Sequence, residues 1–139
     1  MRSKEIKRYM LDTNMASYVI KGANETVRMR LENVPMASVC ISSVTQAELL
    51  RGVARKPDAK QLPVIVNEFL LRVEILPWDS RAAETWAALR TSFEKEGKPL
   101  GAMDMLIAAH AVSSESVLVT NDQAFYNVRK YLTLEDWTK

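Results

Sequence analysis

The sequence has few of the residues that build disulfide or zinc frameworks. Cys40 is the only cysteine and His110 the only histidine among 139 residues. Neither a disulfide framework nor a zinc cluster is therefore available to the chain. Cys40 lies within residues 38–42, a segment with the pattern of a strand, so we expect a buried structural thiol.

The chain also lacks long hydrophobic runs and a strong charge of either sign. No stretch reaches the roughly 18 apolar residues of a membrane span, and residues 1–8 lack the apolar segment of a secretion signal. We therefore expect a cytoplasmic protein without membrane contact. Residues 1–7 are polar, which is consistent with a disordered extension or with a start placed too early in the sequence. The formal net charge of +2 does not identify a nucleic-acid-binding protein, because phosphate binding depends on a local basic patch.

Short apolar strands alternate with helical segments along the chain. The apolar pattern predicts strands at residues 9–11, 39–41, 73–76 and 117–119, with a last edge strand at 131–134. Capping and periodicity predict helices over the following ranges: 15–20, 25–33, 43–54, from the turn at 56–58 to 71, 79–96, 102–113 and 121–125. Residues 43–46 have the pattern of a capping box. This order predicts an α/β domain over residues 1–139, with three α/β/α layers and a mostly parallel sheet of four to five strands.

Four acidic residues fall where the carboxyl ends of the predicted strands meet. Asp12 follows the first strand and Asp122 the fourth, while Glu48 and Asp104 lie in the first two turns of their helices. Parallel sheets collect ligands outside these strand ends. Burying several carboxylates together is unfavourable and raises their pKa values unless a cation neutralises them. Oxygen ligands without histidine or cysteine favour magnesium or manganese over zinc.

Each acid also has a purely structural explanation, and the residues alone leave both open. Asp12 could cap the helix that follows it, and Asp104 could complement a helix N-terminus. Asp122 could form a turn with its own backbone. Glu48 lies one helical turn before Arg51 and could form a surface ion pair with it.

The order of four sequence segments resembles a known family. The segments are LDTN at 11–14, ISSVTQAELLRG at 41–52, GKPLGAMDMLIAA at 97–109 and VTNDQAF at 119–125. Together they resemble the successive motifs of PIN-domain ribonucleases, and most closely the VapC-type toxins of bacterial type II toxin–antitoxin pairs. The resemblance extends from about residue 9 to 137. It implies a PIN-like fold and a metal-dependent endoribonuclease.

The same resemblance implies roles for individual residues. It makes Asp12, Glu48, Asp104 and Asp122 the catalytic and metal-binding acids, with Mg²⁺ or Mn²⁺ as the cofactor. In the family, Asp12 and Asp104 are the most constant ligands, Glu48 binds directly or through water, and Asp122 varies most. Four polar residues are suited to orienting carboxylates or water, namely Thr13, Asn14, Thr120 and Asn121. Among them the resemblance favours Asn14 and Thr120.

The expected partners follow from the resemblance as well. It implies a homodimer, a VapB-like antitoxin whose C-terminal segment covers the acidic groove, and operator DNA bound only through that antitoxin. The expected substrate is a transfer RNA, with a ribosomal RNA loop as the second choice, and its cleavage inhibits translation.

Basic residues near the acids in sequence are candidates for holding RNA phosphates. Arg51, Arg55 and Lys98 are the nearest, although ordinary solvated surface charge explains each of them equally well. His110 follows Asp104 by six residues, so it points roughly 120° around the predicted helix from that acid. We expect His110 to be a packed side chain rather than a general base.

Two other classes of protein compete with the nuclease hypothesis. A haloacid-dehalogenase-like phosphotransferase also carries an aspartate after its first strand, but its second aspartate is replaced here by Asn14. A non-enzymatic relative that binds RNA or protein is the other alternative. Such relatives often lose the acids, and all four are present here.

Overall fold

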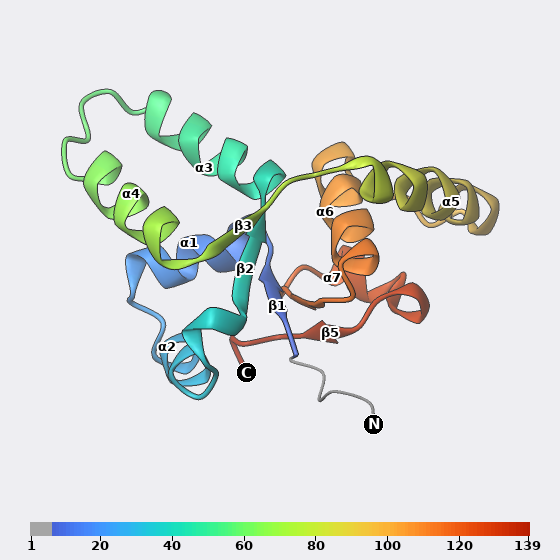
Figure 1. Cartoon of the computed structure of the whole chain (residues 1–139), viewed down its shortest axis with the longest axis horizontal. Helices are drawn as coiled ribbons and strands as arrows, with labels where there is room; N and C mark the ends of the chain where they lie inside the picture. Colours follow the sequence, from blue (N-terminus) through green and yellow to red (C-terminus); the bar gives the residue numbers. More distant parts are fainter. Residues whose placement is uncertain (1–6) are drawn as a thin grey trace.

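The computed structural model describes residues 7–139, which form a five-stranded sheet in the order β3-β2-β1-β4-β5 (Figure 1). All four pairings are parallel, as predicted for most of the sheet. The strands are β1 (Tyr9–Leu11), β2 (Val39–Ser42), β3 (Glu74–Leu76), β4 (Val117–Val119) and β5 (Leu134–Glu135). The predicted extension at residues 1–7 lies outside the described residues, apart from residue 7.

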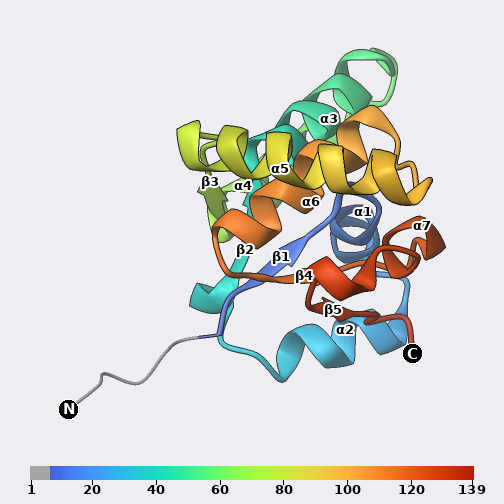
Figure 2. The same cartoon turned by 90° about the vertical axis from the view of Figure 1, so that its right-hand side faces the viewer.

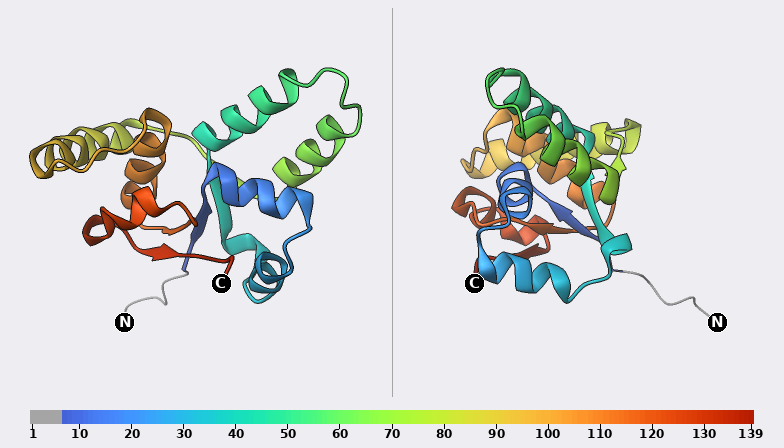
Figure 3. Two further views of the ribbon diagram at one scale, coloured as in Figure 1. Left: turned by 180° about the vertical axis from the view of Figure 1, so that it is seen from behind. Right: turned by 90° about the vertical axis from the view of Figure 1, so that its left-hand side faces the viewer.

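Helices cover both faces of the sheet and make the predicted three layers. On one side lie α1 (Thr13–Lys21), α2 (Glu25–Glu32), α3 (Ser43–Ala54) and α4 (Leu62–Arg72). On the other lie α5 (Ser80–Glu96), α6 (Ala102–Ser113) and the short α7 (Gln123–Tyr126), with α5 outside α6 (Figure 2). Figure 3 shows the loop between α3 and α4 projecting away from the sheet.

Side chains alternate between the two faces of the sheet, as the two-residue period of a strand requires. In β1, Leu11 packs against α1 and its neighbours, while Met10 packs against α6. In β2, Ile41 faces the first side and Cys40 the second, so the predicted burial of Cys40 is confirmed. Burial raises the pKa of its thiol to about 12, so it stays protonated. Strands buried on both faces explain why these segments are continuously apolar.

Some predicted boundaries are wrong by a few residues. The predicted capping box at Ser43 is displaced by one residue, because the Ser42 hydroxyl caps α3 by accepting from the Val44 amide at 3.1 Å. Ser43 lies inside the helix, and its hydroxyl accepts from the Trp78 amide at 3.0 Å. The predicted strand at 131–134 is also displaced. Residues Arg129–Tyr131 form a 3-10 turn, so β5 begins only at Leu134.

The order of the strands places the carboxyl ends of β1 and β4 side by side. The chain runs from β1 outward through β2 to β3, then returns to β4 on the other side of β1. The helices after β1 and β4 therefore leave in opposite directions at the carboxyl ends of these strands, which is where sheets of this kind bind ligands. We call the region at these strand ends the crevice. No helix within residues 7–139 is long and apolar enough to cross a membrane.

Candidate active site

Asp12 lies at this crevice, directly after β1, and is 3% exposed. Its Oδ1 atom accepts a hydrogen bond from the Met15 amide at 2.8 Å, which caps α1. Its Oδ2 atom accepts from the Thr120 hydroxyl, which follows β4, at 2.5 Å. The structural role suggested by the sequence is therefore real, but it uses only part of the carboxylate. A carboxylate has about four acceptor positions, so each oxygen can still accept a further ligand.

Thr120 joins two of the acids. Its buried hydroxyl donates to Asp12 and accepts from the Asp122 backbone amide at 3.0 Å. The Asp122 carboxylate accepts from the Ala124 amide at 3.0 Å and caps α7. The expected local turn at Asp122 is thus present, and it holds this acid at the same strand end as Thr120.

Burial and the charges of neighbouring acids raise the pKa of Asp12 and of Asp104. Burial raises the pKa of Asp12 from 3.8 to about 6, against hydrogen bonds from Thr120 and Met15, and the negative charges of Asp104 and Asp122 add to the rise. Burial also raises the pKa of the half-buried Asp104, with further contributions from the charges of Asp122 and Glu48. The four acids therefore belong to one electrostatic group.

Glu48 reaches this group from α3 through a contact with the neighbour of Asp12. The Thr13 hydroxyl donates to the Glu48 carboxylate and also lies 3.4 Å from the Thr45 hydroxyl. Among residues 7–139 no ion pair joins Glu48 to Arg51, so the surface-pair alternative is not realised. Thr13, which the sequence offers as a residue suited to orienting a carboxylate, thus contacts Glu48.

The other predicted polar residue has a different partner. The exposed Asn14 donates to the Asn121 side chain at 3.5 Å, and Asn121 donates to the Tyr18 hydroxyl at 3.4 Å. These bonds link α1 to the segment between β4 and α7. Asn14 therefore lies at the crevice, but it hydrogen-bonds to another amide rather than to an acid.

The acids offer oxygen donors that suit a hard cation, but they do not form a complete metal site in their present arrangement. Within the described part of the chain, no three acidic, histidine or cysteine side chains converge closely enough to hold a metal ion as they stand. Glu48 accepts from Thr13, and Asp122 caps α7. The donors are nevertheless all oxygens, and a divalent cation would offset the cost of ionising the buried Asp12. The chemistry of these donors therefore suits magnesium or manganese.

The predicted phosphate-binding residues are unequally placed. Arg51 is exposed one helical turn beyond Glu48, whereas Arg55 caps the far end of α3. Lys98, in the loop before α6, pairs with Glu96 at 3.9 Å. The prediction for His110 is confirmed. It is 3% exposed, its Nδ1 lies 2.7 Å from the Ser42 hydroxyl, and burial lowers its pKa.

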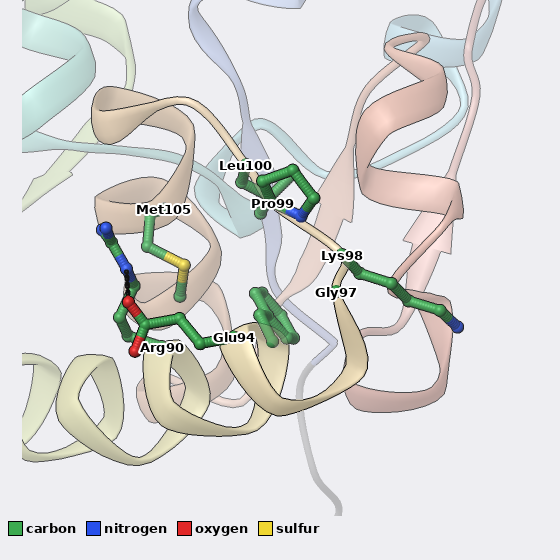
Figure 4. A pocket seen from close by; sticks show the side chains of 8 residues that line it. Arg90, Glu94, Gly97, Lys98, Pro99, Leu100 and Met105 are labelled. Carbon is green, nitrogen blue, oxygen red and sulfur yellow. Dashed lines mark hydrogen bonds and ion pairs between the residues drawn. The ribbon is translucent and has the colours of Figure 1, made fainter.

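A separate pocket of about 320 Å³ lies between α5 and the loop before α6 (Figure 4). Its walls include Arg90, Glu94, Leu100 and Met105, and none of the four acids lines it. Figure 4 also shows that Lys98 extends away from Arg90 and Glu94. The pocket is therefore distinct from the crevice that holds the acids.

Comparisons with known proteins agree with the fold and the order of the motifs. The sequence model of the PIN domain matches residues 9–131. The tRNA(fMet)-specific endonuclease VapC of Shigella flexneri is 33% identical over 131 residues, which cover 94% of this chain and 98% of that protein. Ribonuclease VapC2 of Rickettsia felis is 34% identical, with the same coverage. In the crystal structure of DNA-bound VapBC from Salmonella typhimurium, the matching chain has a TM-score of 0.86 and 33% identity, covering 95% of this chain and 99% of that one.

Proposed function

The chain belongs to the PIN-domain family as a VapC-type ribonuclease, and from this membership we propose that it is a metal-dependent endoribonuclease that cleaves a transfer RNA. The observation that carries the metal-dependent part is the buried Asp12, which shares the crevice with Glu48, Asp104 and Asp122 and whose pKa is raised to about 6. Family membership also favours this function over the haloacid-dehalogenase-like alternative.

The proposal assigns a role to each residue of the crevice. Asp12 and Asp104 are the principal ligands of Mg²⁺ or Mn²⁺, with Glu48 and Asp122 completing the set directly or through water. When bound, the cation supplies an activated water and a positive charge beside the leaving oxygen. Two hydroxyls hold the carboxylates in place, that of Thr120 on Asp12 and that of Thr13 on Glu48. Such outer partners typically change metal affinity or activity by about 10- to 100-fold.

The remaining polar and basic residues act on the substrate. Asn14, held by Asn121, orients water or a nucleotide at the edge of the crevice. Arg51, Arg55 and Lys98 contact phosphates without reading bases, and Arg55 contributes least because it lies at the far end of α3. Selection of one transfer RNA therefore depends on its shape and on contacts beyond these side chains.

We further propose that the protein is the toxin of a type II pair and forms a homodimer. A VapB-like antitoxin covers the acidic groove with its C-terminal segment, and operator DNA is bound only through that antitoxin. The DNA-bound VapBC structure of the Salmonella typhimurium relative supports a VapB-like partner and DNA binding by the complex. Cleavage of a transfer RNA then inhibits translation. A basic antitoxin side chain among the carboxylates would take the place of the cation. Its positive charge would complement the negative charge of the acids, and such complementarity favours binding of this partner.

The decisive experiment is cleavage of purified tRNA(fMet) by the isolated chain with magnesium and with chelator. Attack by an activated water leaves 5′-phosphate and 3′-hydroxyl ends, so these ends are expected. Products with a 2′,3′-cyclic phosphate contradict the mechanism, because they require attack by the ribose hydroxyl. Cleavage that continues in chelator contradicts metal dependence. Mapping cut sites in total RNA after brief expression then distinguishes transfer RNA from a ribosomal RNA loop.

A further inference from the structure

A second hollow, of about 420 Å³, lies beside α7. Its volume falls in the range of about 300 to 1,000 Å³ that small-molecule sites occupy. We call it the basic hollow, and the side chains that define it are Glu96, Lys98, Gln123, Tyr126, Arg129 and Lys130. None of these residues except Lys98 was singled out from the sequence.

The basic hollow carries a surplus of positive charge. Lys98, Arg129 and Lys130 contribute three positive charges against the single negative charge of Glu96, which leaves +2. The Glu96 carboxylate lies 3.3 Å from the Lys130 ammonium and 3.9 Å from that of Lys98, and it accepts from the Tyr131 hydroxyl. Arg129 is exposed and has no ion pair with any residue in 7–139. One carboxylate thus gathers two lysines without neutralising the group.

The basic hollow borders the acidic crevice through two chain segments. Lys98 lies in the loop that leads into α6 and so to Asp104. It also lines the neighbouring pocket, and Figure 4 shows its side chain extending away from Arg90 and Glu94 of that pocket. Tyr126 lies on α7, the helix that Asp122 caps. The Tyr126 hydroxyl donates to the Thr120 carbonyl at 3.1 Å, and Thr120 in turn donates to Asp12. Tyr126 therefore stands between the two sites.

We propose that the basic hollow binds the phosphodiester backbone of the RNA next to the bond that is cut, with Lys98, Arg129 and Lys130 on its phosphates. This inference rests on the proposed function and names the surface that holds its substrate. The acidic crevice repels RNA phosphates, so a nuclease of this kind needs cations close by to keep the strand in place. Lysine and arginine contacts to phosphate supply sequence-independent affinity, and the hollow therefore binds backbone rather than particular bases.

The test is steady-state cleavage of tRNA(fMet) at several salt concentrations by the Arg129→Gln/Lys130→Gln double variant. Loss of two phosphate contacts should raise KM roughly tenfold at moderate salt and reduce the slope of log KM against log salt by about 1.5. The value of kcat should stay within about twofold, because contacts of this kind act equally on ground and transition states. The matched control is Lys21→Gln/Arg28→Gln, which removes one exposed lysine and one exposed arginine elsewhere and should change neither quantity.

A variant that makes the basic hollow more positive distinguishes an effect of charge from damage to the fold. Glu96→Gln removes the single acid of the basic hollow and releases Lys98 and Lys130, so it should lower KM and steepen the salt dependence. Damage to the fold would instead weaken cleavage in both variants. Melting temperatures measured beside the kinetics identify any such damage.

The possible outcomes distinguish the inference from the proposed function. If the wild-type chain cleaves tRNA(fMet) but the double variant keeps the KM and salt slope of the control, the inference is wrong and the function stands. A fall in kcat with unchanged KM also overturns it. If the double variant loses only its binding to the antitoxin, the basic hollow belongs to a protein partner and the RNA assignment is wrong. A wild-type chain that cleaves no RNA with magnesium overturns both.

Discussion

Asp12 and Asp79 occupy the same local position in two parts of the chain, and their surroundings differ. Each follows a strand, caps the next helix and accepts a hydrogen bond from the amide three residues later, from Met15 at 2.8 Å and from Ala82 at 3.0 Å. Burial raises the pKa of Asp12 to about 6. Asp79 is exposed, and the hydrogen bond from Ala82 lowers its pKa.

The difference arises from the position of the preceding strand in the sheet. β1 has β2 on one side and β4 on the other, so the carboxylate that follows it accepts from Thr120 after β4 and feels the charges of Asp104 on α6 and of Asp122. β3 is an edge strand, and Asp79, three residues after it, is exposed. A capping aspartate is therefore a local feature of the sequence, whereas its chemistry depends on which strands lie beside it.

The largest predicted effect is on catalysis. Asp12→Asn and Asp104→Asn should each reduce cleavage of tRNA(fMet) by at least about a hundredfold, since even outer partners of a metal site change activity by 10- to 100-fold. Asp79→Asn should keep activity within about twofold, because its carboxylate lies outside the crevice. The measurement is the cleavage rate of all three variants under saturating magnesium. Full activity in Asp12→Asn would mean that its carboxylate, like that of Asp79, acts only as a helix cap. Full activity in Asp104→Asn would remove Asp104 from the catalytic acids.

A second effect, on stability, tests the charge of Asp12 without RNA or metal. Its folded-state pKa lies above the usual 3.8, so the native state binds the proton more tightly than the unfolded chain, and the unfolding free energy falls as pH rises from about 4 to about 6. The Asp12→Asn variant has no ionisable group at this position, so its unfolding free energy does not show this decrease. Between pH 3 and 8 its stability relative to wild type should therefore rise by up to about 3 kcal/mol, at about 1.4 kcal/mol per unit of pKa shift.

Urea unfolding in chelator at both pH values provides this measurement. The new amide also disturbs the hydrogen bond from Thr120, but that cost is present at both pH values and cancels in the comparison. A stability difference between Asp12→Asn and wild type that is the same at pH 3 and pH 8 would contradict the raised pKa.

The third effect is the stabilisation that magnesium adds. Magnesium at ten times its dissociation constant should stabilise the native state by about 1.4 kcal/mol, and for a chain of this size that corresponds to a rise in melting temperature of about 4 °C. Wild type and Asp79→Asn should show this rise, while Asp12→Asn and Asp104→Asn should show less than about half of it, because they bind the ion more weakly. Equal shifts in all four proteins would place the metal elsewhere.

The sequence predicts the inner strands well because they depend on short-range patterns. The apolar runs of β1 and β4 are visible in the sequence, and the structure has strands there. The cap at Asp12, left open by the sequence as an alternative role, is present. The helix start at Ser42 was missed by one residue, because Ser43 is equally suited to capping. Ser43 instead binds the Trp78 amide, 35 residues away, which no local pattern records.

The contacts that complete the site are also long-range. Thr13 donates to Glu48 across 35 residues, and Thr120 donates to Asp12 across 108. The basic hollow combines Lys98 with Arg129 and Lys130, which are separated along the chain and meet only because α7 and the following turn pack beside the end of α5. Sequence patterns indicated which acids and some of which hydroxyls and cations to consider, but their pairing, and the grouping of Lys98 with Arg129 and Lys130, required the fold.

The smallest predicted effect is that of Asp79→Asn on stability, and its sign is opposite to that of Asp12→Asn. A lowered folded-state pKa stabilises the native state above the unfolded value of about 4, and this contribution is lost as pH falls through the folded pKa. The amide oxygen of asparagine can still accept from Ala82, so the variant should lose only a little melting temperature at pH 8 and nothing at pH 3. Because Asp79 is exposed, added salt should shrink this difference, whereas the effect at buried Asp12 should persist. Melting curves of both variants from pH 3 to 8, at low and high salt, make the comparison. An Asp79→Asn protein that gains stability toward high pH, as expected for Asp12→Asn, would show that the two caps share one electrostatic environment and would remove the reason to treat Asp12 as part of a catalytic group.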